Sequence, residues 1–398
     1  MPVDRTRQFR LPGIQDLNKD QDEALALPVE GQHLIVGGPG TGKSVVALLR
    51  ARRLAQNNKT YWTLVYNHLL DHSNRHLFGN EQTFSANTWN AWFSNIFKYF
   101  CSSNVPMLEP KSVGDWQEID WNSVEEKVQY LGEDKFQDHS NKFLIIDEGQ
   151  DMPPAFYRTL YDLGFDNFYV AADQNQQIHP DKCSSRQDIE ITLGIKPGDT
   201  LELKTNYRNT RPIALLAQHF YPADPASPRP DLPNLKPPAA ATPELWTYGT
   251  ANTRTLAAIA DYILQLSDLN PRKLIGIITP NNKVRNKFNN ALLRANPKLD
   301  NDKPPIQTFV SGQRELPNFG QGGLMIINAQ SCKGLEFDTV ILADIDQHEP
   351  KHNQHALMAR FYVMVARARE QVILLRTGNV CPVVDGLLPT DPTILARK

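Results

Sequence analysis

Glycines, a lysine and a serine near the start of the chain follow the spacing GxxxxGK[ST] of a phosphate-binding loop. The residues expected to bind phosphates are Gly37, Gly40, Thr41, Gly42, Lys43 and Ser44. The loop lies between an apolar run at 34–36 and a helical pattern that begins at Val45. Glycines let backbone N–H groups converge on a phosphate at a helix N-terminus. The lysine would reach the β- and γ-phosphates of ATP, and the serine hydroxyl would complete a Mg²⁺ shell.

Two adjacent carboxylates, Asp147 and Glu148, follow a second apolar run at 143–146. Hydrolysis of a nucleoside triphosphate needs one carboxylate on the magnesium ion and a second group that orients the attacking water. In parallel α/β sheets, ligands bind beyond the carboxyl ends of the strands, where both residues would lie. We therefore expect Asp147 to hold Mg²⁺ and Glu148 to polarise the water.

The elements that must position these residues are short apolar runs separated by helical patterns, which is typical of parallel α/β sheets. The runs lie at 34–37, 63–66, 143–146, 168–171, 245–248, 274–279, 306–310, 324–327, 340–343 and 372–375. A chain of 398 residues fits two domains. We place them at 1–200 and 201–398, with a small helical insert at about 100–140 that begins in a capping box at Ser123. Prolines between 222 and 243 predict an extended connection.

The composition excludes several classes of protein. Lys and Arg number 42 against 44 Asp and Glu, which gives a net charge of −2 and no general basic surface for nucleic acid. Four scattered cysteines form no CxxC pair, so the sequence predicts neither a disulfide framework nor a zinc site. Because no apolar run approaches the length that spans a bilayer and the first residues do not resemble a secretion signal, we expect a cytoplasmic protein.

Further segments occur in the order found in one known family. They are DEGQD at 147–151, LKTNYRN at 203–209, KGLEFD at 333–338 and RFYVMVARAR at 360–369. The chain thereby resembles the UvrD-like superfamily 1 DNA helicases, reduced to their two RecA-like core domains. The resemblance implies a P-loop NTPase fold with accessory domains reduced or absent, because the spacings leave little room for them.

The resemblance also implies roles for individual residues. Gln21 would read adenine, and Tyr207 would stack on that base. Glu336 would lie near the ribose. Gln176 would couple the γ-phosphate to a bound strand, while Arg208 and Arg367 would reach the γ-phosphate from the second domain.

The motifs that contact nucleic acid in this family are matched less completely than those of the ATP site. The segments 64–70 and 88–93 resemble motifs Ia and Ib, and they offer Trp89, Trp92 and Phe93 as stacking residues or, alternatively, as core residues. Where relatives carry stacking aromatics after motif III, this chain reads Ile178-His179-Pro180-Asp181, in which His179 is the one ring that could stack. Base stacking contributes about 1–3 kcal/mol per base to the binding of a single strand. The sequence therefore predicts strand binding less strongly than it predicts ATP binding.

Two functions of different classes follow. The first is an ATP-hydrolysing helicase or translocase that acts on single-stranded nucleic acid, with DNA favoured over RNA. The alternative is an ATP-dependent switch subunit that partners a nuclease or another effector, as in Gabija-like defence systems, with little unwinding of its own. A kinase that uses the phosphate loop would have no place for the segments at 203–209, 333–338 and 360–369.

Overall fold

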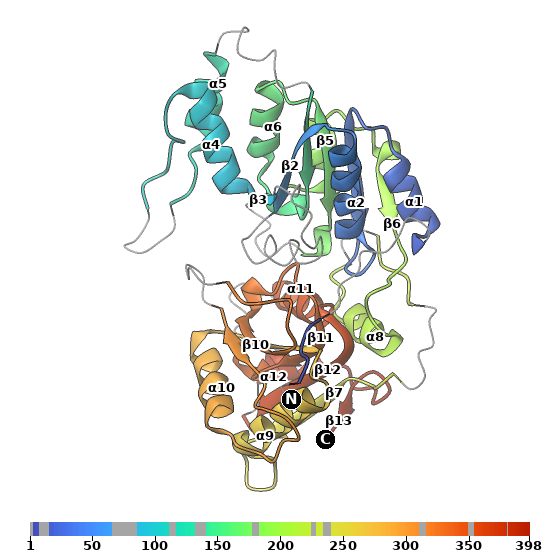
Figure 1. Cartoon of the computed structure of the whole chain (residues 1–398), viewed down its shortest axis with the longest axis vertical. Coiled ribbons are helices and arrows are strands. Elements are labelled where there is room, and N and C mark those ends of the chain that lie inside the picture. Colours follow the sequence, from blue (N-terminus) through green and yellow to red (C-terminus); the bar gives the residue numbers. More distant parts are fainter. Residues whose placement is uncertain are drawn as a thin grey trace.

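The computed structural model describes residues 3–7, 16–65, 86–110, 117–131, 141–176, 183–223, 228–233, 240–309, 316–348, 354–379 and 381–398. These residues form two lobes, each built around one parallel sheet, with α11 and α8 of the second lobe facing the first (Figure 1). The two parallel sheets flanked by helices confirm the predicted α/β class and are consistent with RecA-like domains.

The sheet of the first lobe has the order β3-β2-β4-β5-β1-β6. Its strands are β1 (Gln32–Gly37), β2 (Thr60–Val65), β3 (Ala86–Thr88), β4 (Lys142–Ile146), β5 (Asn167–Ala172) and β6 (Leu201–Leu203). Leu34 and Val36 pack in one core cluster and Ile35 in another, because successive side chains point to opposite faces of a strand. Both faces of this sheet are therefore covered.

The sheet of the second lobe has the order β13-β7-β12-β11-β8-β10-β9. Its strands are β7 (Glu244–Tyr248), β8 (Leu274–Thr279), β9 (Ile306–Thr308), β10 (Gly323–Asn328), β11 (Phe337–Leu342), β12 (Ala368–Thr377) and β13 (Ala396–Arg397). Each apolar run predicted from the sequence overlaps one of the strands of the two sheets. Full burial of β5, β8 and β11 explains why these runs are apolar throughout.

Helices cover the first sheet on both faces. They are α1 (Lys19–Ala26), α2 (Lys43–Gln56), α4 (Trp89–Cys101), α5 (Trp121–Gln129), α6 (Pro154–Asp162) and α7 (Arg186–Thr192). Apolar residues of α1 and α2 pack on one face, and those of α4 to α7 pack on the other. The phosphate loop between β1 and α2 is thus held between two elements with buried sides.

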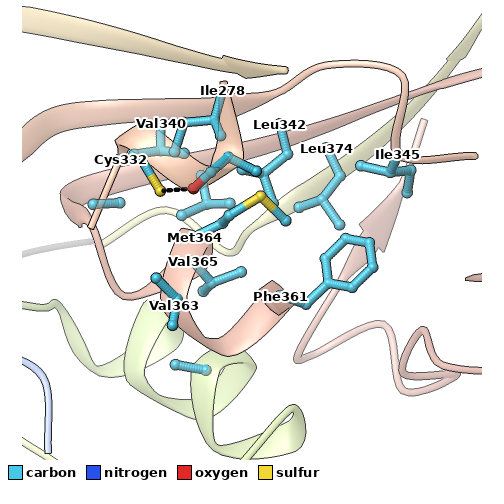
Figure 2. Packing of buried hydrophobic residues seen from close by; sticks show 14 of the residues in the cluster. Ile278, Cys332, Val340, Leu342, Ile345, Phe361, Val363, Met364, Val365 and Leu374 are labelled. Atoms are coloured by element: carbon cyan, nitrogen blue, oxygen red, sulfur yellow. Dashed lines mark hydrogen bonds between the residues drawn. The ribbon is translucent and has the colours of Figure 1, made fainter. Parts of the chain in front are cut away.

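The second sheet is also covered on both faces. Its helices are α8 (Arg211–His219), α9 (Leu256–Leu269), α10 (Asn282–Arg294), α11 (Gln354–Val365) and α12 (Pro382–Asp385). Figure 2 shows Phe361 and Met364 of α11 against Leu342 and Leu374 of the strands. This packing fixes the end of α11, and with it the position of Arg367 two residues later.

The first sheet extends past the boundary that we place at residue 200. Leu201 pairs with Ile35, and the rest of β6 continues beside β1. At the other end of the chain, Thr6 forms an antiparallel bridge with Gln321, and Arg7 pairs with Asp338 at 3.2 Å. Residues 4–7 therefore pack on the second lobe, ahead of the first sheet in sequence.

Helix α5 lies within the predicted insert but begins before Ser123, where the sequence predicts a capping-box start. α5 starts at Trp121, and the carboxylate of Asp120 accepts hydrogen bonds from the backbone N–H and the hydroxyl of Ser123. The predicted capping box at Ser123 is therefore wrong, because an aspartate three residues earlier caps the helix.

Of the residues described between 224 and 243, none belongs to a helix or strand.

In the described ranges, no helix combines the length and the apolar character that crossing a membrane requires.

Candidate functional site

The phosphate loop joins β1 to α2 with two residues in the left-handed region. Gly40 has φ 79° and Gly42 has φ 90°, values that favour glycine. The ammonium of Lys43 donates hydrogen bonds to the carbonyl oxygens of Gly37 at 2.7 Å and Gly38 at 2.9 Å. The lysine is buried and holds its own loop together, so a phosphate would have to replace these carbonyl partners.

Asp147 follows β4 and is buried next to the phosphate loop. Its Oδ1 accepts a hydrogen bond from the backbone N–H of Glu148 at 3.0 Å, whereas Oδ2 has no partner among the described residues. Burial and the charge of Glu148 raise the pKa of Asp147 to about 6, although the Ser44 hydroxyl acts in the opposite direction. A buried carboxylate oxygen without a donor, beside a serine hydroxyl, is a donor set that fits Mg²⁺.

Glu148 has φ 58°, an uncommon backbone conformation for a residue with a side chain. Its Oε2 accepts a hydrogen bond from the side chain of Gln150 at 2.6 Å, and Gln150 in turn accepts one from the backbone N–H of Asp173 at 2.9 Å. Burial raises the pKa of Glu148, but the charges of Lys333 and Lys43 outweigh that effect, so its pKa is lower than usual. The side chain is an oriented, ionised carboxylate.

A chain of polar contacts runs from the phosphate loop into the second lobe. Lys43 lies 3.8 Å from Oδ2 of Asp173, and the same oxygen accepts a hydrogen bond from the Gln176 amide at 2.6 Å. The carbonyl oxygen of that amide accepts a hydrogen bond from the guanidinium of Arg367. Arg367 is 1% exposed, so the predicted arginine is enclosed between the lobes and faces the first.

Arg208 lies in the loop that joins β6 to α8. The backbone N–H of Tyr207 donates to the carbonyl of Gly40 at 2.8 Å, and a Cβ added to Gly40 would lie 2.9 Å from Cβ of Arg208. The guanidinium of Arg208 forms an ion pair with Glu336. Arg208 therefore lies beside the phosphate loop. Arg208 and Glu336, which the resemblance assigns to the γ-phosphate and to the ribose, form an ion pair with each other.

The residues predicted to bind the base lie at the outer end of the loop. Gln21 donates from its amide to the carbonyl of Thr41 at 2.9 Å and also caps α1 together with Asn18. The amide of Asn18 donates to the hydroxyl of Tyr207 at 2.7 Å, and the Tyr207 side chain is 46% exposed. Gln21 and Tyr207 are thus close to one edge of the phosphate loop, with the tyrosine ring open to solvent.

Sequence reasoning gave no role to Lys333 and Asp151, although both lie inside the segments that carry the resemblance. Lys333 is 2% exposed and donates to both carboxylate oxygens of Asp151, at 2.6 and 2.7 Å, and to the carbonyl of Gln176 at 2.7 Å. Its ammonium is 3.9 Å from Oε2 of Glu148. A buried ion pair between the lobes therefore adjoins the carboxylate expected to orient water.

Trp92 and Phe93 belong to the core of the first lobe. Trp92 is 5% exposed and packs against Trp62 and Phe165, while Phe93 is fully buried. Trp89 is partly buried and contacts Phe156 with ring centroids 5.3 Å apart. The alternative of core packing is correct for Trp92 and Phe93, so the stacking hypothesis is wrong for these two. Residues 66–70 of the motif Ia resemblance, and His179, lie outside the described residues.

Comparisons with known proteins agree with part of this picture. Residues 323–375 match the family model described as UvrD-like helicase C-terminal domain. No curated protein matches the chain. A solved structure of the C-terminal domain of a possible DNA helicase from Lactobacillus plantarum shares 18% identity, covering 48% of this chain and 98% of that chain with a TM-score of 0.32. The family match places a segment similar to a UvrD-like helicase C-terminal domain in the second lobe.

Proposed function

We propose that this chain binds ATP and Mg²⁺ between its lobes and hydrolyses ATP as a superfamily 1 helicase or translocase on single-stranded nucleic acid, DNA in preference to RNA. The observation that carries the proposal is the chain of contacts from Lys43 through Asp173 and Gln176 to Arg367. It joins a phosphate-binding lysine on one lobe to a buried arginine on the other.

On this proposal, the phosphate loop binds the phosphates through its N–H groups and through Lys43, which exchanges two carbonyl partners for phosphate oxygens. Ser44 and Asp147 would hold Mg²⁺, which neutralises phosphate charge when bound. The oxygen of Asp147 without a partner supports this assignment. The ionised carboxylate of Glu148, oriented by Gln150, would position the attacking water.

Arg208 and Arg367 would meet the charge that spreads over the phosphoryl oxygens in the transition state. Each guanidinium now has a partner, Glu336 for Arg208 and Gln176 for Arg367. Both side chains are already near the phosphate loop, so a modest change of partner would bring them to a γ-phosphate. Closure of the lobes on ATP and reopening after hydrolysis would follow from making and losing these contacts.

The base and sugar would lie at the exposed end of the loop. The ring of Tyr207 offers a stacking surface, and Gln21 would read adenine after releasing the carbonyl of Thr41. Glu336 would approach the ribose once Arg208 turns to the phosphates. The direct bond between Asn18 and Tyr207 supports a shared base site, because it ties the two sides of this region together.

The proposal is tested by ATP turnover measured with and without single-stranded oligonucleotides. We expect single-stranded DNA to raise turnover at low salt and the effect to weaken as salt increases, because strand binding displaces counterions. Single-stranded RNA, and duplex DNA of the same sequence, serve as controls. Turnover that no oligonucleotide changes at low salt would contradict action on nucleic acid.

A specific observation favours the second function, an ATP-dependent switch subunit for a nuclease or similar effector. Trp92 and Phe93, the aromatic residues offered for base stacking, are buried in the core. With a net charge of −2, the chain also has no general excess of basic residues. ATP turnover that ignores oligonucleotides but responds to a co-purified nuclease would support this function instead.

A further inference from the structure

A short part of the connection between α8 and β7 lies against the phosphate loop. We call residues Arg229, Pro230 and Asp231 the 229–231 segment. The carbonyl of Pro230 accepts a hydrogen bond from the side chain of Gln218 on α8 at 2.8 Å. The backbone N–H of Asp231 donates to the carbonyl of Lys204 at 2.7 Å, directly after β6. The segment is therefore fixed to an element of each lobe.

Pro230 is buried, and its ring touches the backbone of Gly38 in the phosphate loop. A Cβ added to Gly38 would overlap Cγ of the Pro230 ring and would lie 2.8 Å from Cδ. The same Cβ would lie 3.2 Å from the hydroxyl of Tyr362 on α11. Gly38 is not among the residues with positive φ, so contact with neighbours, and not backbone conformation, restricts this position to glycine.

The peptide that Pro230 touches also holds the phosphate-binding lysine. The carbonyl oxygen of Gly38 accepts hydrogen bonds from Lys43 at 2.9 Å and from the hydroxyl of Thr41 at 2.8 Å. A shift of Gly38 would therefore displace the carbonyl oxygen that accepts hydrogen bonds from Lys43 and Thr41. Proline suits such a contact because its ring is rigid and it has no N–H group to leave without a partner.

We propose that Pro230 is a positioning residue for the phosphate loop. Its ring fixes the Gly38 peptide, and its attachments to Gln218 and Lys204 link the loop to both α8 of the second lobe and the end of β6. Movement of the lobes would thereby alter the shape of the loop and its affinity for nucleotide. This inference rests on the proposed ATP site, since the consequence that matters is nucleotide binding.

The test is a double-mutant cycle with Gly38→Ala, Pro230→Ala and the double variant. The dissociation constant of a non-hydrolysable ATP analogue, the turnover number and the nucleotide-free thermal midpoint are measured for each. We expect Gly38→Ala to weaken nucleotide binding by about tenfold or more, because the added methyl group forces the loop to shift. Pro230→Ala alone should weaken binding by about threefold, since the loop loses its support.

The double variant should bind about as tightly as Pro230→Ala alone, because alanine at 230 removes the two ring atoms that the added Cβ meets. Pro228→Ala, a proline two residues earlier in the same connection, is the matched control and should bind like the wild type. A Gly38→Ala variant that fails to fold would still support the contact if Pro230→Ala restores folding.

The inference is overturned if Gly38→Ala binds nucleotide normally, or if its defect is unchanged by alanine at 230. It is also overturned if the variants shift only the thermal midpoint and leave nucleotide affinity unaltered, because Pro230 would then serve packing alone. If the wild-type chain binds no nucleotide, the proposed function fails. In that case the thermal midpoints of the cycle still test the Gly38–Pro230 contact, and a lack of coupling between the two positions would refute it.

Discussion

The guanidinium of Arg367 donates a hydrogen bond to the side-chain carbonyl of Gln176, although the two residues belong to different lobes. Gln176 lies in a 3-10 turn after β5, and Arg367 lies between α11 and β12. Because the amide of Gln176 also donates to Asp173, which faces Lys43, a change at the phosphate loop reaches Arg367 through two side chains. If the proposed ATP site is correct, this relationship would let the lobes respond to a bound phosphate.

Replacing Lys43 should affect ATP binding, whereas replacing Glu148 should affect ATP turnover. Lys43→Ala should abolish binding of ATP, because the ammonium neutralises phosphate charge. Glu148→Gln should keep binding and block turnover, because the neutral amide cannot accept a proton from water. Equilibrium binding of a fluorescent ATP analogue and steady-state phosphate release separate the two effects. An equal loss of affinity in both variants would refute the roles given to them.

Removing one partner of the buried pair Lys333 and Asp151 should lower the free energy of unfolding strongly. Lys333→Met leaves the carboxylate of Asp151 buried without its cation, which costs about 3–5 kcal/mol. Adding Asp151→Leu should recover most of that loss, because position 151 then no longer carries a buried carboxylate without its cation. Urea unfolding followed by fluorescence measures both changes.

The control for that prediction is an exposed ion pair. Lys19 and Glu23 are 3.7 Å apart with side chains 87% and 54% exposed. Lys19→Met should change the free energy of unfolding by less than about 1 kcal/mol. If Lys333→Met and Lys19→Met unfold at the same urea concentration as the wild type, the pair between the lobes has no structural role.

His348 should make the protein less stable as pH falls. Its ring is 1% exposed, neither nitrogen has a hydrogen-bond partner among the described residues, and burial together with Arg360 lowers its pKa to about 3. The unfolded chain takes up a proton near pH 6.5 and the folded chain does not, so stability present above that pH is lost progressively between about 6.5 and 3. From pH 7 to 5 the loss should be about 2 kcal/mol.

A variant identifies the residue responsible. His348→Leu should remove this part of the pH dependence of the free energy of unfolding, while His355→Gln at an exposed position should leave it intact. Urea unfolding at pH 7 and pH 5 gives the comparison. Equal pH dependence in the wild type and His348→Leu would show that the histidine is not the source.

The strands and the phosphate loop could be predicted because their signals are local. A strand buried on both faces must be apolar along its length, and the loop pattern needs only residues 37–44 in sequence. The aromatic residues of α4 carried a local signal too. Trp89, Phe93, Phe97 and Phe100 recur at helical spacing, which is typical of a helix face that packs in a core. That periodicity favours core packing over base stacking.

The contacts between the lobes could not be predicted in the same way. Lys333 and Asp151 are separated by 182 residues, and nothing in either segment says how two sheets will meet. The contact between the Pro230 ring and Gly38 likewise depends on the path of an extended connection. Proline content predicted that this connection is neither helix nor strand, but backbone restriction alone does not say what it touches.

In the proposed function, ATP is hydrolysed between the lobes, and Arg208 and Arg367 complete the site. The most direct measurement is ATP turnover at saturating ATP and Mg²⁺ for the wild type, Arg208→Ala and Arg367→Ala, with the exposed Arg211→Ala as the control. We expect each of the two variants to lose roughly 10³-fold in turnover with nucleotide affinity much less affected, and lysine at either position to restore little. Arg211→Ala should match the wild type. Turnover that survives both replacements at the wild-type rate would contradict the account.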